Sequence, residues 1–218
     1  MMRMHRLFSL EMPFVRFVRN VALMSIASLA PVLGLYVALS PGFGAMLLNG
    51  GPALSRFLRQ VITNGLPVVF VVNYISFFLF AWMNAWPTGK RDAAFVVLID
   101  VSARLAAFVL LHVLIYVLSA DWFGSFGGSR MTALSVVAPT LARSALFDNI
   151  SGVYLYATLV SALPLYVAVI ERSVLFGGLA RSFPGRSGSF LLAFALFAVF
   201  VLLLTGVAST IVNFMSLK

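Results

Sequence analysis

The sequence AAFVVLIDVSARLAAFVLLHVLIYVL, residues 93–118, decides the fold. It is apolar almost throughout, with one acid and one base near its centre. An α-helix rises about 1.5 Å per residue, so a stretch of this length can cross a hydrocarbon core about 30 Å thick. A membrane β-strand needs only about 9–11 residues and alternates apolar with polar positions, which this stretch does not do. The segment therefore predicts a transmembrane helix.

Four other apolar stretches predict four more transmembrane helices, at about 21–39, 66–86, 150–170 and 190–213. The chain is 62% apolar and 10% charged, with a mean hydropathy of +1.06, whereas soluble domains are about 45–50% apolar and about 25% charged. This composition excludes a disordered chain, and the lack of cysteine excludes disulfides and thiolate metal sites. The predicted fold class is all-α: a single integral membrane domain over residues 1–218, a polytopic helix bundle with about five transmembrane helices and short interfacial helices.

The distribution of basic residues predicts the orientation of the bundle. With a cytoplasmic N-terminus, nine Lys and Arg residues lie on the cytoplasmic side and five lie outside, as the positive-inside rule requires. The C-terminus is then outside. Arginine-rich, lysine-poor usage without cysteine favours a bacterial inner (plasma) membrane. The cytoplasmic set is Arg3, Arg6, Arg16, Arg19, Lys90, Arg91, Arg172, Arg181 and Arg186, and the outer set is Arg56, Arg59, Arg130, Arg143 and Lys218.

Residues 131–147 offer an alternative topology with a sixth span. The segment has only 17 residues and contains Pro139 and Arg143. A sixth span would also move three arginines outside and remove the charge bias. We therefore expect an interfacial or half-inserted helix here.

Basic residues near the membrane surface predict contacts with lipid headgroups. Residues 1–20 alternate arginine with large apolar side chains, which fits either an interfacial amphipathic helix or a simple basic anchor before the first span. Arg16, Arg19, Lys90 and Arg91 are the expected headgroup contacts. The net charge of +9 lies largely in short loops between apolar runs, and no base-stacking motif accompanies it. The lipid bilayer is therefore an expected partner, and nucleic acid is not.

A second interfacial helix is expected to begin at Pro52. Apolar residues recur at helical spacing over residues 53–62, while Arg56 and Arg59 face away from them. The helix either ends before the second span or continues into it through residues 61–65.

A strip of small residues runs along the first span. Ala30, Gly34 and Ala38 recur every fourth residue, which leaves a flat surface where another helix can approach closely. Close packing drives helix association in lipid, so the strip predicts a helix-packing surface. Pro31 in the same span predicts a kink.

Asp100 and Arg104 are the most informative polar residues of the chain. They lie one helical turn apart, so their side chains can meet on one face of the span 93–118. A charge at mid-membrane costs about 2.5–3.5 kcal/mol even on insertion scales and needs a partner or a polar cavity. Asn73, central in the second span, also needs a partner, and Arg104 or Asp100 is the natural candidate. The residues form either an ion or proton site or a neutralised pair that fixes helix register, and the sequence does not separate these readings.

His112 completes the predicted intramembrane polar site. An intramembrane histidine can ligate haem, but haem between helices usually requires a second ligand, and the other histidine is His5 in the N-terminal segment. A hydrogen-bonded packing role is the better interpretation. We expect no cofactor and no metal.

The motifs of membrane enzymes are missing from the sequence. It lacks His-Glu-x-x-His and a Gly-x-Ser-x-Gly nucleophile motif, and its six acids are scattered. We therefore expect a non-enzymatic helix-packing subunit (scaffold, accessory or sensor component) whose partners are other membrane protein subunits or further copies of itself. The alternative is a small-solute or ion transporter or channel that uses the site around Asp100, Arg104 and Asn73.

Overall fold

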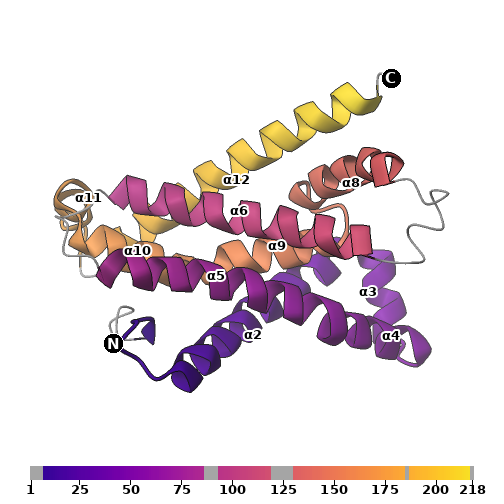
Figure 1. Ribbon diagram of the computed structural model, residues 1–218, viewed down its shortest axis with the longest axis horizontal. Coiled ribbons are helices and arrows are strands. Elements are labelled where there is room, and N and C mark those ends of the chain that lie inside the picture. Colours follow the sequence, from indigo (N-terminus) through magenta and orange to yellow (C-terminus); the bar gives the residue numbers. More distant parts are fainter. Residues whose placement is uncertain (1–6, 86–92, 119–129, 185–186, 217–218) are drawn as a thin grey trace.

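The computed structural model describes residues 7–85, 93–118, 130–184 and 187–216, and every regular element in these ranges is helical (Figure 1). The elements are α2 (Phe14–Leu39), α3 (Pro41–Leu48), α4 (Pro52–Gln60), the π-helix η1 (Val61–Gly65), α5 (Leu66–Ala85), α6 (Ala93–Leu118), α8 (Arg130–Ala145), α9 (Ile150–Ser161), α10 (Leu163–Arg172), α11 (Val174–Ala180) and α12 (Ser187–Ser216).

Five helices in the described ranges are long and apolar enough to span a membrane, which confirms the predicted all-α class and the predicted number of candidate spans. The start of α2 and the end of α12 lie at opposite ends of the molecule (Figure 1), as an odd number of spans requires. The five candidate spans are Phe14–Leu39, Pro52–Met83, Phe95–Leu118, Ile150–Arg172 and Ser187–Met215.

The first span begins earlier than the sequence indicated. Helix α2 starts at Phe14, directly after Pro13 at its N-cap, and continues through the predicted boundary at residue 21. Residues 14–20 are therefore not a separate interfacial helix, because no helix-breaking residue separates them from the apolar run that follows. Pro31 lies inside α2 without ending it.

The second span is continuous with the helix that begins at Pro52. Helix α4 passes through η1 directly into α5, so the continuing alternative is the observed one. Gly65, the last residue of η1, lies against the ring of Tyr154 on α9, and a Cβ atom at this position would overlap that ring. The local widening of the helix and the missing side chain together bring α9 close to this end of the second span.

The fourth span forms the centre of the bundle and is broken into two helices. Within its most apolar window 67% of the residues are buried, against 6% for α12. Pro164 lies in the first turn of α10, just after the break at Ala162. Helices α2, α5, α6 and α8 pack against α9, while α12 contacts α8, α10 and α11 at the edge of the bundle. The segment predicted as an interfacial or half-inserted helix is α8, which packs against α6, α9 and α12.

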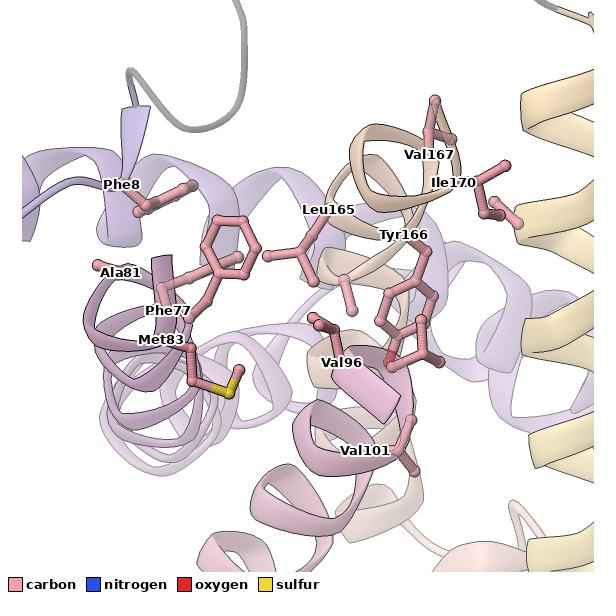
Figure 2. Packing of buried hydrophobic residues seen from close by; sticks show 14 of the residues in the cluster. Phe8, Phe77, Ala81, Met83, Val96, Val101, Leu165, Tyr166, Val167 and Ile170 are labelled. Carbon is pink, nitrogen blue, oxygen red and sulfur yellow. The ribbon is translucent and has the colours of Figure 1, made fainter. Parts of the chain in front are cut away.

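Two apolar clusters follow one another along the bundle. The proximal cluster lies against the first part of α2, contains Phe8, Phe77 and Leu165, and is shown in Figure 2. The distal cluster lies farther along α2 and contains Leu29 and Phe108. All five candidate spans contribute to both clusters, and α12 does so through Ala193 and Ala208. The other four pass from one cluster to the other within eight residues or fewer. The passage lies between Val21 and Leu29 on α2, Val72 and Phe77 on α5, Val101 and Phe108 on α6, and Leu159 and Ala162 at the break between α9 and α10.

The Gly65 contact gives a stability prediction. Gly65→Ala should force the Tyr154 ring or the helix to move and should destabilise the bundle by about 1–3 kcal/mol, the usual cost of overpacking. Thermal unfolding of the purified protein measures the effect. The matched control is Gly206→Ala on α12, where a Cβ meets nothing within 4 Å and the better helix propensity of alanine should keep or raise the unfolding temperature. Equal behaviour of the two variants would contradict the close approach at Gly65.

Candidate functional site

A layer of polar side chains separates the two apolar clusters. Each of the four spans that pass from one cluster to the other over a short distance carries a buried polar side chain at or next to that passage. These side chains are Ser25 on α2, Asn73 on α5, Asp100 and Arg104 on α6, and Thr158 and Ser161 on α9, all at most 3% exposed. Because the polar residues coincide with the passage points, the layer lies across the middle of the bundle.

Arg104 is the centre of this layer and is 0% exposed. Its Nε donates to Asp100 Oδ2 at 2.7 Å, so the pairing expected from their spacing is present as a salt bridge. Its Nη1 lies 2.7 Å from Asn73 Oδ1, 2.7 Å from the carbonyl oxygen of Thr158 and 2.9 Å from Ser161 Oγ. One guanidinium therefore joins α6 to both α5 and α9.

The carbonyl of Thr158 is available to Arg104 because α9 ends there. In a continuous helix this oxygen would accept from the N–H of Ala162, four residues later. Instead the Ala162 N–H donates to the carbonyl of Leu159 at 3.1 Å, and Pro164 begins the next helix with no N–H to offer. The last carbonyls of a helix carry partial negative charge, which favours a cation at this position. The break in the fourth span thus supplies a ligand for the arginine.

Asp100 balances the charge of Arg104. Its Oδ2 accepts from Arg104 Nε and from the hydroxyl of Tyr166 on α10, the latter at 3.0 Å. Removing two charges from water costs several kcal/mol per ion, and their attraction repays this only where further hydrogen bonds satisfy both partners. Tyr166 is one such bond. It also ties the second half of the broken span to α6.

Asn73 extends the network to α2. Its Oδ1 accepts from Arg104 Nη1 and lies 2.7 Å from Ser161 Oγ, while its Nδ2 donates to Ser25 Oγ at 3.0 Å. Of the two partners predicted for Asn73, the structure selects Arg104. Ser25 in turn donates to the carbonyl of Val21 in its own helix at 2.9 Å. No feature of the sequence singles out Ser25, because serine in an apolar helix commonly bonds back to its own backbone.

Two atoms of the ion pair have hydrogen-bonding capacity that the described residues do not use. Asp100 Oδ1 and Arg104 Nη2 are buried without a partner in this part of the chain, as are Ser76 Oγ and the Tyr154 hydroxyl. Arg104 Cζ lies 5.0 Å from the centre of the Phe77 ring, within the range of a cation–π contact. The guanidinium is therefore bonded on the side of Nε and Nη1 and covered by an aromatic ring.

His112 does not join the network. Its Nδ1 donates to the carbonyl of Phe108 at 2.9 Å, and its ring lies 4.0 Å from the Phe108 ring. The residue packs within its own helix two turns beyond Arg104, which is the interpretation preferred from the sequence. Over the described ranges no group of three or more His, Cys, Asp or Glu residues could hold a metal ion.

The other predicted positions lie on the surface. Ala30, Gly34 and Ala38 are exposed, and a Cβ on Gly34 would meet nothing within 4 Å. Helix α2 packs inside the chain through a different face, which contains Ser25, Ser28, Leu29 and Val32. Arg16 and Arg19 are exposed near the start of α2, while Lys90 and Arg91 lie outside the described residues.

Comparisons of this chain with known protein families, with curated proteins and with solved structures found no match. The class that the structure defines is an all-helical bundle with five helices long and apolar enough to span a membrane. Its interior contains a buried polar network in which Asp100 balances the charge of Arg104. The role of this network is therefore inferred from its distances, burial and hydrogen bonds.

The network gives a prediction about single and double substitutions. Asp100→Leu or Arg104→Leu alone leaves a buried charge unpaired and should cost about 3–5 kcal/mol, seen as lost folded yield and a lower unfolding temperature. The double variant should recover most of this loss, because replacing both members of a buried pair is often neutral. Recovery should be incomplete, since Tyr166 loses its acceptor.

The control for this series is Arg143→Leu, which removes an arginine from an exposed position on α8. It should leave yield and unfolding temperature close to those of the parent. Single variants of Asp100 and Arg104 that behave like this control would show that the buried pair is not important for folding.

Proposed function

We propose that this protein is a non-enzymatic membrane subunit, a scaffold, accessory or sensor component that packs laterally against other membrane proteins or against further copies of itself. The observation that carries the proposal is the complete burial of Arg104 at 0% exposure, with bonds to three other residues and one backbone carbonyl. In this interpretation the strongest polar feature of the chain holds its helices in register. The function then lies on the outer surface of the bundle.

The energetics of the buried pair support an internal structural role. A charge in a low-dielectric interior is stabilised only when fixed dipoles and an opposite charge replace its hydration. Arg104 receives a carboxylate, an amide oxygen, a hydroxyl and the carbonyl of Thr158 near the end of α9. Each of these ligands comes from a different residue on three helices, so the arrangement links the relative positions of those helices.

The outer surface offers two features that suit lateral association. The strip Ala30, Gly34, Ala38 faces outward from α2 and is not used for packing inside the chain. Helix α12 is 6% buried within its most apolar window and exposes Phe194, Leu202 and Leu203 along its length. Lipid can cover both surfaces, but small residues at fourfold spacing specifically favour a helix partner.

The proposed setting is a bacterial inner membrane, with the start of α2 on the cytoplasmic side. Helices α10 and α11 lie near that end of the bundle, and α3 and α4 lie toward the other end (Figure 1). Arg16, Arg19, Arg172 and Arg181 on or next to α2, α10 and α11 are exposed, as are Arg56 and Arg59 on α4 and Arg143 on α8. The basic residues of the first group suit contact with anionic headgroups on the cytoplasmic leaflet.

A small-solute or ion transporter is a second candidate, and one observation favours it. Arg104 Nη2 and Asp100 Oδ1 have no partner among the described residues and lie next to a broken helix. Transporters commonly bind substrates and coupling ions at such breaks near the bilayer midplane. The test is solute or ion uptake by proteoliposomes that contain the parent protein or the Asp100→Leu, Arg104→Leu double variant. Uptake that is present with the parent and lost in a double variant of normal folded yield would favour this function over the subunit proposal.

The strip on α2 gives the main test of the proposed function. Gly34→Leu should hold a partner helix away from α2 and weaken assembly at least ~10-fold, a loss of about 1.4 kcal/mol of association. Association in mild detergent or in bicelles measures it. The control is Gly206→Leu on α12, the same change at another exposed helical glycine with open space around its Cβ.

Folding should be unaffected in both variants, because neither glycine touches another part of the chain. Equal assembly of Gly34→Leu and the parent would mean that the strip faces lipid. An equal loss in both variants would show that the effect is not specific to the strip.

The orientation can be tested with single cysteines, because the natural chain has none. Ser55 on α4 and Ser182 after α11 are both exposed, and the proposed topology puts them on opposite sides of the membrane. In intact cells an impermeant thiol reagent should label Ser55→Cys and not Ser182→Cys, whereas both should react in opened vesicles. The reverse pattern would invert the topology.

A further inference from the structure

The short segment before α2 folds back onto the bundle. Residues 7–13, called here the N-terminal strap, place Phe8 in the proximal cluster at 1% exposure. The Phe8 ring stacks on Phe77 of α5 with a centroid distance of 4.0 Å and an interplanar angle of 3°, and it meets Phe17 edge to face at 5.7 Å. Figure 2 shows Phe8 beside Phe77 at the edge of the cluster.

Polar contacts with α2 hold the strap in place. Asn20 Nδ2 donates to the carbonyl of Leu7 at 2.9 Å and lies 3.6 Å from Met12 Sδ. The strap turns between Ser9 and Met12, where a backbone bond of 3.1 Å closes the loop. Leu7 and Met12 are partly buried against the same apolar cluster. The segment is thus a defined part of the fold that is attached by few contacts.

Phe77 lies between the strap and the polar network. Phe8 covers one face of the Phe77 ring, and Arg104 Cζ lies over the ring at 5.0 Å from its centre. Phe77 therefore contacts both the buried ring of the strap and the guanidinium. These two contacts of Phe77 connect the strap to the buried charge.

We propose that the N-terminal strap is a removable plug that holds Phe77 closed over Arg104. When the strap leaves, Phe77 loses the ring that fixes its rotamer, and water enters from the end of the bundle where α2 begins. Arg104 Nη2 and Asp100 Oδ1, which have no partner among the described residues, are the atoms that this water would bond first. The strap thereby controls whether the ion pair is dry or hydrated, a property independent of the proposed subunit function.

The physical basis of the proposal is the difference in local stability between the strap and the bundle. Segments with few buried contacts open with a much smaller free energy than the whole protein. The strap contributes one fully buried ring and a few polar contacts, whereas the helices around Arg104 share two clusters and the network. Opening of the strap alone is therefore the least costly way to reach the charge.

The test uses a cysteine reporter in the otherwise cysteine-free chain. Ser76 is 1% exposed, and its Oγ has no partner among the described residues, so Ser76→Cys changes little in the parent. It lies one turn from Asn73 toward the end of α5 and directly precedes Phe77. The measurement is the rate at which sulfonatoethyl methanethiosulfonate, an anionic water-soluble thiol reagent, modifies the purified full-length protein, followed by intact mass.

Phe8→Ala should accelerate modification of this reporter at least ~10-fold. A tenfold rise in the population with an open strap requires the free energy of opening to fall by only about 1.4 kcal/mol. The matched control is Phe14→Ala, since Phe14 is 69% exposed on α2; it should leave the rate unchanged. An unchanged rate in Phe8→Ala, or an equal rise in Phe14→Ala, overturns the proposal.

Two further variants separate opening of the strap from general loosening. Ser28→Cys places the same reporter at a position 4% exposed and one turn beyond Ser25, and its rate should not rise with Phe8→Ala. A parallel rise at this position would mean that the whole bundle has loosened and would overturn the plug. If Phe8→Ala does not elute as a folded protein, Asn20→Ala decides: it removes the strap anchor and leaves the stack in place. Faster modification of Ser76→Cys then supports the proposal, and an unchanged rate rejects it.

Discussion

The hydrogen bonds and salt bridge of one buried guanidinium are the constraint on which the rest of this structure depends. Arg104 has no exposed surface, and its ligands come from α5, α6 and the end of α9, with α2 attached through Asn73 and Ser25. A charge in such a place is tolerated only if all of these groups reach it together. The helices that supply them can therefore slide or rotate little without leaving a charge or a dipole unpaired.

The break in the fourth span makes this arrangement possible. A continuous helix would use the Thr158 carbonyl for its own backbone bond, and the arginine would have to share that oxygen with a backbone N–H. The interruption at Ala162 frees that carbonyl for Arg104, and Tyr166 on α10, beyond the break, bonds to Asp100. The broken span is also the most buried one, while α12 lies at the edge with little buried surface. The polar network thus depends on this interruption for one of its ligands.

The bundle has a closely packed interior and an exposed lateral surface. Inside, two apolar clusters enclose the polar layer on both sides, and the strap closes the proximal cluster through Phe8. Outside, the small residues of α2 and the apolar length of α12 face the surroundings. A protein built in this way has its specific chemistry buried and its available contacts on lateral surfaces, which is why we favour a role in association over one in catalysis.

Composition and periodicity by themselves determined the helical class, the five candidate spans and the pairing of Asp100 with Arg104, because span length and one-turn spacing are local properties of the chain. They could not assign Ser25 or the Thr158 carbonyl to the network, since a serine and a backbone oxygen look ordinary until other helices come near. The same limit applied to Phe8, which lies in the segment 1–20 that was predicted as either an interfacial helix or a basic anchor and which the fold buries against Phe77. It also applied to the strip Ala30, Gly34, Ala38, whose spacing indicates a packing surface while only the tertiary structure shows that α2 packs internally through another face. Contacts between residues far apart in the chain depend on how the helices are arranged around the buried charge, and that arrangement exists only in the folded bundle.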